Sequence, residues 1–275
     1  MFTLNCKGKL LVIDQPIVMG IINITPDSFY SESRSHSIDE ILFRAEKMIS
    51  DGATILDIGG QSTRPKSNQI PAEEEMERVL PAIEAIHRQF PEQIISVDTF
   101  YSQVARQAIG AGASIINDVS AGSVDDELLP AVAELKVPYV LMHMLGKPQT
   151  MQQNPEYKNV ILEVFDFLNF KIAELVKMGI HDIIVDVGFG FGKTSTHNFQ
   201  LLRELSYFKQ LGKPVMVGLS RKATIYKTLG IAPDEALNGT TVLHTIALLN
   251  GATILRVHDV REAIQAVKLV SEYKK

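Results

Sequence analysis

Short apolar runs alternate with amphipathic segments along nearly the whole chain. Between the runs, apolar residues recur at the three- and four-residue spacing of a helix, as in Met76, Val79, Leu80, Ile83 and Ile86. The runs themselves are unbroken, which is typical of buried parallel strands. There are eight of them, at residues 17–22, 55–58, 94–97, 115–116, 139–142, 183–185, 215–217 and 254–257. Eight strand–helix pairs predict an α/β fold of the (β/α)8 (TIM) barrel type, with a doubly wound open sheet as the alternative.

A six-residue phrase that begins Gly-Ala and ends in a polar residue occurs three times, at 52–57, 112–117 and 251–256. In each copy we expect the glycine to be the left-handed stop of a helix and the apolar residues to form a buried strand. Upstream of the first copy, Ser37 and Glu40 have the spacing of a capping box that opens a helix. Residues 2–13 precede the first strand, and their Lys-Gly-Lys centre predicts a short N-terminal hairpin over the barrel's floor.

Composition narrows the class of protein and of partner. The chain has 275 residues, of which 45% are hydrophobic and 21% charged, and no linker divides it, so we expect a single domain over residues 1–275. A net charge of −5 argues against nucleic acid as a partner. No window approaches eighteen unbroken apolar residues, so no membrane partner is expected. The lone cysteine, Cys6, and the lack of a signal-peptide core predict a reducing cytoplasm.

Polar side chains lie at or just beyond the carboxyl end of every predicted strand. They are Asn23, Asp57, Asp98, Asn117, Asp118, His143, Asp186, Ser220, Arg221, Lys222, Arg256 and His258. Any one of them could equally be a helix cap, but together they would be costly to bury at one rim without a ligand. Because a (β/α)8 barrel builds its site at the carboxyl ends of its strands, we expect them to converge there.

The residue types indicate two subsites. Asp98, Asn117, Asp186 and Lys222 offer acceptors, an amide and a cation, which suits a flat heterocycle with N–H donors and a carbonyl. Strand eight closes onto strand one, so Arg64, Arg256 and His258 predict an anion subsite. For Arg256 the alternative is an ion pair with a neighbouring strand-end aspartate.

Two features of the sequence suggest common binding motifs but do not match their required spacing. Residues 188–193 (GFGFGK) resemble a phosphate loop, but Val187 stands where a Walker A motif needs glycine and Lys193 where a dinucleotide motif does. We expect a mobile loop whose phenyl rings cover a flat ligand. The histidines have no zinc-site spacing, so no structural zinc is expected.

Eight segments, in order along the barrel, carry a resemblance to a known family. They are residues 20–29 (GIINITPDSF), 57–65 (DIGGQSTRP), 96–99 (SVDT), 116–118 (IND), 143–144 (HM), 186–193 (DVGFGFGK), 220–222 (SRK) and 256–260 (RVHDV). On these segments the chain resembles the bacterial dihydropteroate synthase family.

The resemblance implies a (β/α)8 transferase of folate biosynthesis that is a sulfonamide target. It would join 4-aminobenzoate to 6-hydroxymethyl-7,8-dihydropterin diphosphate, giving 7,8-dihydropteroate and pyrophosphate. The family implies Mg2+ as cofactor and a homodimer formed through the helices of repeats seven and eight. Because the pterin ring can donate electrons to its exocyclic methylene, we expect the diphosphate to leave before the aniline attacks, in a Mg2+-assisted dissociative substitution.

Carried over by position, the resemblance implies roles for particular residues. The pterin would bind to Asp98, Asn117, Asp186 and Lys222. The diphosphate would bind to Asn23, Thr63, Arg64, Arg256 and His258, with Asn23 also a Mg2+ ligand. The 4-aminobenzoate would bind to Phe29, Thr63, Pro65, Phe191 and Ser220. The catalytic residues would be Asp98, Lys222, Arg256 and Arg64.

The chain departs from the family at Val187, usually proline, at Gln61, commonly Glu or Ala, and at Tyr30-Ser31-Glu32, usually Ser-Asp-Gly. Two other functions stay open. A pterin-binding methyltransferase that serves a corrinoid protein would share the pocket but would not need the anion subsite. A non-catalytic pterin-binding barrel would not need Asn23, Arg64, Lys222 and Arg256.

Overall fold

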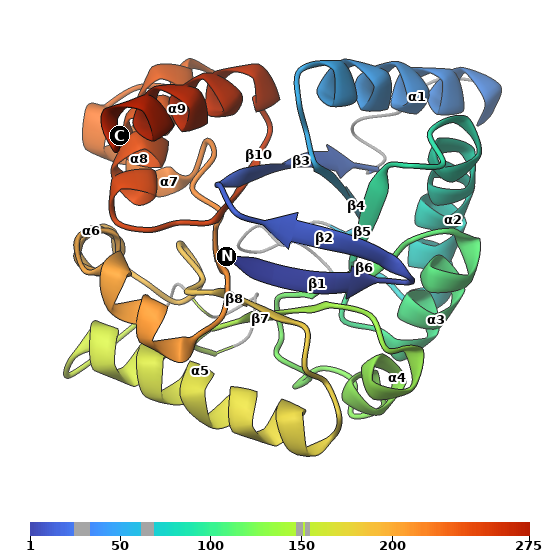
Figure 1. The fold of residues 1–275 in the computed structure, drawn as a ribbon, viewed down its shortest axis with the longest axis horizontal. Coiled ribbons are helices and arrows are strands. Elements are labelled where there is room, and N and C mark those ends of the chain that lie inside the picture. Colours follow the sequence, from blue (N-terminus) through green and yellow to red (C-terminus); the bar gives the residue numbers. More distant parts are fainter. Residues whose placement is uncertain (25–33, 62–68, 147–150, 152–154) are drawn as a thin grey trace.

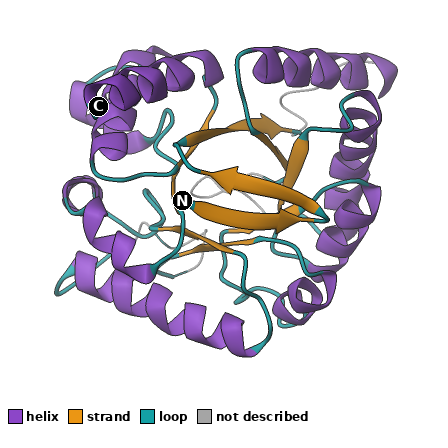
Figure 2. Cartoon of the chain, in the orientation of Figure 1, coloured by secondary structure: helices purple, strands orange, loops and turns teal. Residues whose placement is uncertain are grey.

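In the computed structural model, which describes residues 1–24, 34–61, 69–146, 151 and 155–275, eight parallel strands close into a barrel in the order β10-β3-β4-β5-β6-β7-β8-β9. Helices surround the strands (Figure 2). The strands are β3 (Ile17–Asn23), β4 (Ile55–Gly59), β5 (Ile94–Asp98), β6 (Ile115–Asp118), β7 (Tyr139–Met142), β8 (Ile183–Asp186), β9 (Val215–Val217) and β10 (Ile254–Val257). The predicted (β/α)8 barrel is confirmed.

The helices follow the strands in sequence. They are α1 (Arg34–Ser50), α2 (Ala72–Gln89), α3 (Ser102–Ala111), α4 (Leu128–Leu135), α5 (Val160–Lys177), α6 (Ser195–Arg203), α7 (Ala223–Leu229), α8 (Leu237–Leu249) and α9 (Val260–Tyr273), with the 3-10 segments η2 (Leu205–Leu211) and η3 (Pro233–Glu235). No helix in the described ranges is long and apolar enough to cross a membrane.

The N-terminal hairpin is also confirmed. Strands β1 (Phe2–Cys6) and β2 (Lys9–Ile13) pair antiparallel across one end of the barrel (Figure 1). Lys7 and Gly8 make the turn with φ of 55° and 91°. One face of the hairpin packs with Met19, Ile55 and Ile254 inside the barrel, so this end of the lumen is closed by apolar side chains.

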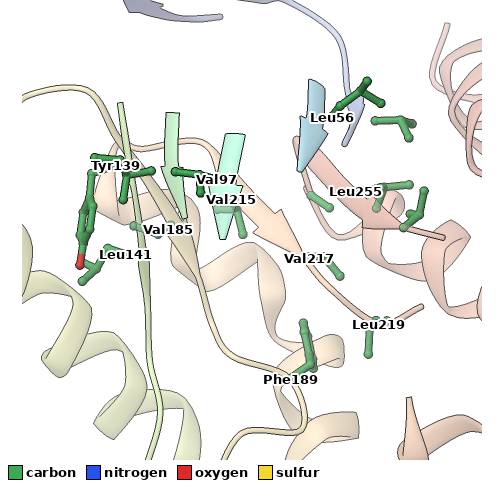
Figure 3. Close-up of a cluster of buried hydrophobic side chains, with 14 of the residues drawn as sticks. Leu56, Val97, Tyr139, Leu141, Val185, Phe189, Val215, Val217, Leu219 and Leu255 are labelled. Carbon is green, nitrogen blue, oxygen red and sulfur yellow. The ribbon is translucent and has the colours of Figure 1, made fainter. Parts of the chain in front are cut away.

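Strand residues that face outward pack under the helices. Figure 3 shows Leu56, Val97, Val185 and Leu255 in this outer core, all of them fully buried. Successive residues of a strand face opposite sides, so Ile55 fills the lumen while Leu56 packs beneath the helices. Burial on both sides explains why the strands read as unbroken apolar runs.

The repeated glycines end helices as expected. Gly52, Gly112 and Gly251 have φ of 105°, 125° and 100°, which favours glycine. At Gly112 a Cβ atom would also lie 2.4 Å from the His87 ring, so the position has no room for a side chain. The capping box at Ser37 is wrong, because α1 begins at Arg34 and Ser37 therefore lies inside the helix.

Candidate active site

Strand register brings polar residues into the carboxyl end of the lumen. Asp57 on β4 is two residues beyond Ile55 and therefore shares its inward face, and Asp57 pairs with Ser96 on β5. Asp98 in turn pairs with Asn117 on β6. Arg256 lies two residues beyond Ile254 on β10. The lumen is thus apolar beside the hairpin and polar at the opposite end.

Arg256 is bound between two carboxylates. Its Nε donates to Asp57 Oδ2 at 2.6 Å, and its Nη2 donates to Asp98 Oδ2 at 2.6 Å. Asn117 Nδ2 also donates to Asp57 Oδ2, at 3.0 Å. The Asp57 side chain is fully buried, whereas those of Asp98 and Arg256 are 11% and 20% exposed. The ion pair considered as the alternative for Arg256 therefore exists.

Burial and charge act in opposite directions on this cluster. Burial raises the pKa of Asp98, and the Arg256 guanidinium opposes that rise. Burial alone would lower the pKa of Arg256, but Asp57 and Asp98 raise it overall. The guanidinium consequently stays charged, with Nη1 as the nitrogen that these contacts do not use.

Asp186 and Lys222 face each other from neighbouring repeats. A Cβ atom on Gly218 would lie 3.9 Å from both Asp186 Oδ2 and Lys222 Nζ, so the missing side chain leaves space between the two groups. Burial lowers the pKa of Lys222 to about 8, against the opposing effect of Asp186. Burial raises the pKa of Asp186, with Lys222 opposing. A carboxylate and a cation on either side of this space can bind a polar heterocycle from two sides.

The turn after β8 is packed more tightly than expected. Phe189 is 1% exposed and lies in the outer core (Figure 3). Its carbonyl accepts a hydrogen bond from Lys222 Nζ, which also lies 4.6 Å from the centre of the half-buried Phe191 ring. The expectation that both phenyl rings cover a ligand is therefore wrong for Phe189, because its side chain points away from the lumen.

Ser220 and His258 form a polar pair at the ends of β9 and β10. The Ser220 Oγ lies 2.9 Å from His258 Nδ1 and accepts from the His258 backbone N–H at 3.2 Å. Next to them, Arg221 makes a two-pronged ion pair with Asp259 through contacts of 2.9 and 2.8 Å. The two loops are thus held together beside the Arg256 cluster.

Asn23 is exposed at the end of β3, near Asp98. A Cβ atom on the intervening Gly59 would lie 3.5 Å from both Asn23 Oδ1 and Asp98 Cβ. Four other predicted site residues, Phe29, Thr63, Arg64 and Pro65, lie outside the described residues. The structure therefore gathers the predicted pterin residues and part of the predicted anion subsite.

The sequence placed Asp57 and His143 at strand ends but did not reveal their contacts, and it grouped Asp118 wrongly. Asp57 faces the lumen because it lies two residues beyond Ile55, whose side chain fills the lumen. Lys193 and His143 are buried together behind the pocket, which the sequence does not reveal. Asp118 faces outward and accepts from Tyr139 Oη at 2.7 Å, so only Asn117 of this pair belongs to the site.

The structure shows the surroundings of two residues that differ from the family pattern, Val187 and Gln61. Val187 is fully buried, which fits its apolar side chain. Gln61 donates to Glu75 Oε2 at 3.1 Å and accepts from the Ile70 backbone N–H at 3.0 Å. The third departure, Tyr30-Ser31-Glu32, lies outside the described residues.

The chain is similar to known proteins over nearly its full length. The family model described as "Pterin binding enzyme" matches residues 19–258. The dihydropteroate synthase of Haemophilus influenzae is 43% identical over 268 residues, which is 97% of each chain. That of Escherichia coli is 43% identical over 269 residues, 97% of this chain and 95% of the relative.

Solved structures of dihydropteroate synthases also match the fold of this chain. A Yersinia pestis dihydropteroate synthase in complex with a sulfonamide drug superposes with a TM-score of 0.93 at 38% identity, covering 99% of both chains. The Xanthomonas albilineans enzyme in complex with 7,8-dihydropteroate superposes with a TM-score of 0.87 at 37% identity, covering 99% of this chain and 98% of that one.

Proposed function

Because this chain belongs to the pterin-binding enzyme family, with dihydropteroate synthases as its full-length relatives, we propose that it forms 7,8-dihydropteroate. The substrates would be 4-aminobenzoate and 6-hydroxymethyl-7,8-dihydropterin diphosphate, with pyrophosphate released. The observation that carries this proposal is the convergence of Asp98, Asn117, Asp186 and Lys222 at the polar end of the lumen.

The pterin fits this end of the lumen by its hydrogen-bonding pattern. Its amino-pyrimidinone edge presents parallel N–H donors, and a carboxylate such as Asp186 can accept two of them. Lys222 would donate to a ring carbonyl or nitrogen from the other side of the space above Gly218. Asp98 and Asn117 add an acceptor and an amide on the facing strands.

The leaving diphosphate fits the rim where β3 and β10 meet. Strand β10 pairs with β3, so Arg256, His258 and Asn23 lie on neighbouring strand ends. The Arg256 guanidinium can offer Nη1 to an anion while Nε and Nη2 stay bound to the carboxylates. Thr63 and Arg64 would complete this subsite, and Phe29, Thr63 and Pro65 would meet Phe191 and Ser220 around the aminobenzoate.

A Mg2+ ion is compatible with this rim. No group of three or more His, Cys, Asp or Glu side chains in the described part of the chain could hold a metal. Mg2+ commonly binds through one or two protein oxygens, with substrate phosphates and waters filling its other positions. The exposed Asn23 amide at the end of β3 would supply one such oxygen. Bound there, the ion would neutralise charge on the departing diphosphate.

The remaining chemistry falls to side chains of this chain. Loss of diphosphate leaves a pterin cation, which the carboxylates of Asp98 and Asp186 would stabilise in a pocket closed to bulk water on its apolar side. Ser220 and Phe191 would position the aniline, whose neutral nitrogen forms the C–N bond to the methylene that the diphosphate has left. The anilinium nitrogen formed in this step is acidic and can release its proton to water, so no strong general base is needed.

The first test of the pterin site is Asp186→Asn. This change removes a charge-assisted contact, so we expect about 2 to 4 kcal/mol less transition-state stabilisation, measured as kcat/KM. The fold should survive, because the amide is nearly the size of the carboxylate and can keep an acceptor for the Gly188 N–H. Unchanged kinetics in a folded Asp186→Asn protein would mean that the pterin binds elsewhere.

The pH profile offers a second prediction. Burial lowers the pKa of Lys222 to about 8, and its charged form is the one that donates to the pterin. The ammonium is fully charged below this pH and is lost above it, so kcat/KM should fall as the pH rises through about 8. A profile that stays flat to pH 9.5, with the protein still folded, would remove Lys222 from this role.

We also propose a homodimer formed through α8 and α9. Val242, Ile246 and Leu249 on α8 are 50%, 37% and 42% exposed, and Leu269 and Tyr273 on α9 are 72% and 80% exposed. Exposed apolar side chains gathered on adjacent helices are typical of a protein interface. Light scattering of the purified protein would separate a dimer from a monomer.

The expected cytoplasmic location stays a prediction, which cell fractionation would test.

A further inference from the structure

Lys193 is a buried lysine outside the predicted substrate contacts, and burial lowers the pKa of its amino group to about 7. Its side chain lies at the end of the turn after β8, and the residue is only 2% exposed. The Nζ atom lies 2.9 Å from His143 Nδ1 and donates to the carbonyls of Phe191 at 3.0 Å and His143 at 3.3 Å. In its charged form Lys193 uses all three ammonium donors in these contacts. Lys193 therefore binds protein atoms and is not placed to contact substrate.

The turn that Lys193 holds contacts two residues of the predicted pterin site, Asp186 and Lys222, and contributes a third side chain, Phe191. The Gly188 N–H donates to Asp186 Oδ1 at 2.7 Å. The Phe189 carbonyl accepts from Lys222 Nζ, and the Phe191 ring lies beneath the same ammonium. A shift of this turn would therefore move the carboxylate, the cation and the ring together.

His143 anchors this turn from the end of the neighbouring strand, β7. It follows β7, its backbone N–H donates to the Asp186 carbonyl at 3.1 Å, and its ring makes an edge contact with Phe167. Burial lowers the pKa of His143 to about 3, so the ring stays neutral and its Nδ1 can accept from Lys193. At Gly188, where φ is 71°, a Cβ atom would lie 1.9 Å from the His143 carbonyl oxygen, so the turn needs glycine to approach this closely.

We propose that Lys193 is a positioning residue of the active site, which fastens the 188–192 turn to His143 and thereby orients Asp186, Lys222 and Phe191 toward the pterin. The inference rests on the proposed function, because it assumes that the pterin binds to Asp186 and Lys222. Its physical basis is that a free lysine side chain adopts many conformations, whereas Lys222 tethered to a fixed carbonyl loses little further entropy when ligand binds.

The test compares Lys193→Met with Thr194→Ala. Methionine keeps the buried aliphatic volume but removes the donors. Alanine at 194 removes only the N-cap of α6, where Thr194 Oγ1 accepts from the His197 N–H at 3.2 Å. Calorimetry with 6-hydroxymethylpterin should give a Kd about tenfold weaker for Lys193→Met. Thr194→Ala should lower the melting temperature and leave the Kd unchanged.

Steady-state kinetics should show the same division. Lys193→Met should raise KM for the dihydropterin diphosphate and lower kcat, whereas Thr194→Ala should change neither at a temperature where it is folded. Wild-type Kd and KM values in a folded Lys193→Met protein would overturn the inference. Equal losses of pterin affinity in Lys193→Met and Thr194→Ala would also overturn it, since that result indicates a general stability effect.

A second pair of variants tests the support if Lys193→Met does not fold. His143→Asn places an amide oxygen near the position of Nδ1 and can still accept from Lys193, whereas His143→Leu cannot. The inference expects near wild-type pterin affinity for His143→Asn and a Kd about tenfold weaker for His143→Leu. Equal affinities in the two would contradict it. A wild-type protein that binds no pterin would instead reject the proposed function.

Discussion

EDTA should reduce dihydropteroate formation by the purified protein to background, and added Mg2+ should restore it. The departing diphosphate is highly charged, Asn23 is neutral, and Arg256 already shares its charge with Asp57 and Asp98. The described side chains at this rim therefore carry little free positive charge for the leaving group, and we propose that a hard cation supplies most of it. Release of pyrophosphate, followed continuously, measures the effect.

Pterin binding is the control for the EDTA experiment. The proposed pterin site does not require the ion, because it consists of Asp98, Asn117, Asp186 and Lys222. The affinity for 6-hydroxymethylpterin should therefore be the same with and without the chelator. Asn23→Ala should raise the Mg2+ concentration needed for half-maximal turnover. Full turnover in EDTA, with metal content confirmed as nil, would remove both the ion and Asn23 from the proposed mechanism.

Arg256→Met should be the most destabilising single change in the described site. It leaves Asp57 and Asp98 buried side by side without their cation, which is expected to cost about 3 to 5 kcal/mol of unfolding free energy. The loss should grow as the pH rises above 7. Burial raises the pKa of Asp98 to about 7 although Arg256 opposes the rise, so without Arg256 the carboxyl should hold its proton to a higher pH. Below pH 7 the protonated Asp98 carries no unpaired charge, and the variant should recover relative to wild type. Urea unfolding at several pH values measures this.

Two further variants check the cause of that loss. Arg221→Met breaks a partly exposed ion pair with Asp259, with side chains 31% and 19% exposed, so it should cost about 1 kcal/mol or less. Adding Asp57→Asn to Arg256→Met should restore part of the stability, because it removes one uncompensated carboxylate. If Arg256→Met costs no more than Arg221→Met, the buried cluster is not held by charge pairing.

The sequence predicted the elements of the fold well, and the reason is local. Each strand is buried on both faces, so its apolar run marks its position. The predicted runs at 139–142, 215–217 and 254–257 coincide with β7, β9 and β10. The glycine stops were predictable because each needs a backbone conformation that other residues rarely adopt. The family resemblance was confirmed by relatives over nearly the full length.

The site was predictable as a set of residues but not as a set of contacts. Which way a strand-end residue faces depends on register, so Asn117 and Asp118 looked equivalent although only Asn117 faces the lumen. The partner of Arg256 depends on how strands far apart in the sequence meet. Burial of Lys193 in a glycine-rich turn contradicts the usual exposure of lysine, and no periodicity signals it.

The central claim is that this chain makes dihydropteroate, and one assay tests it most directly. Purified protein is incubated with 4-aminobenzoate, 6-hydroxymethyl-7,8-dihydropterin diphosphate and Mg2+, and the products are identified by mass spectrometry. The claim predicts 7,8-dihydropteroate and pyrophosphate in equal amounts, formed repeatedly per active site. A folded protein that binds 6-hydroxymethylpterin in calorimetry yet forms no dihydropteroate would contradict it and would favour a methyltransferase or a non-catalytic pterin-binding barrel.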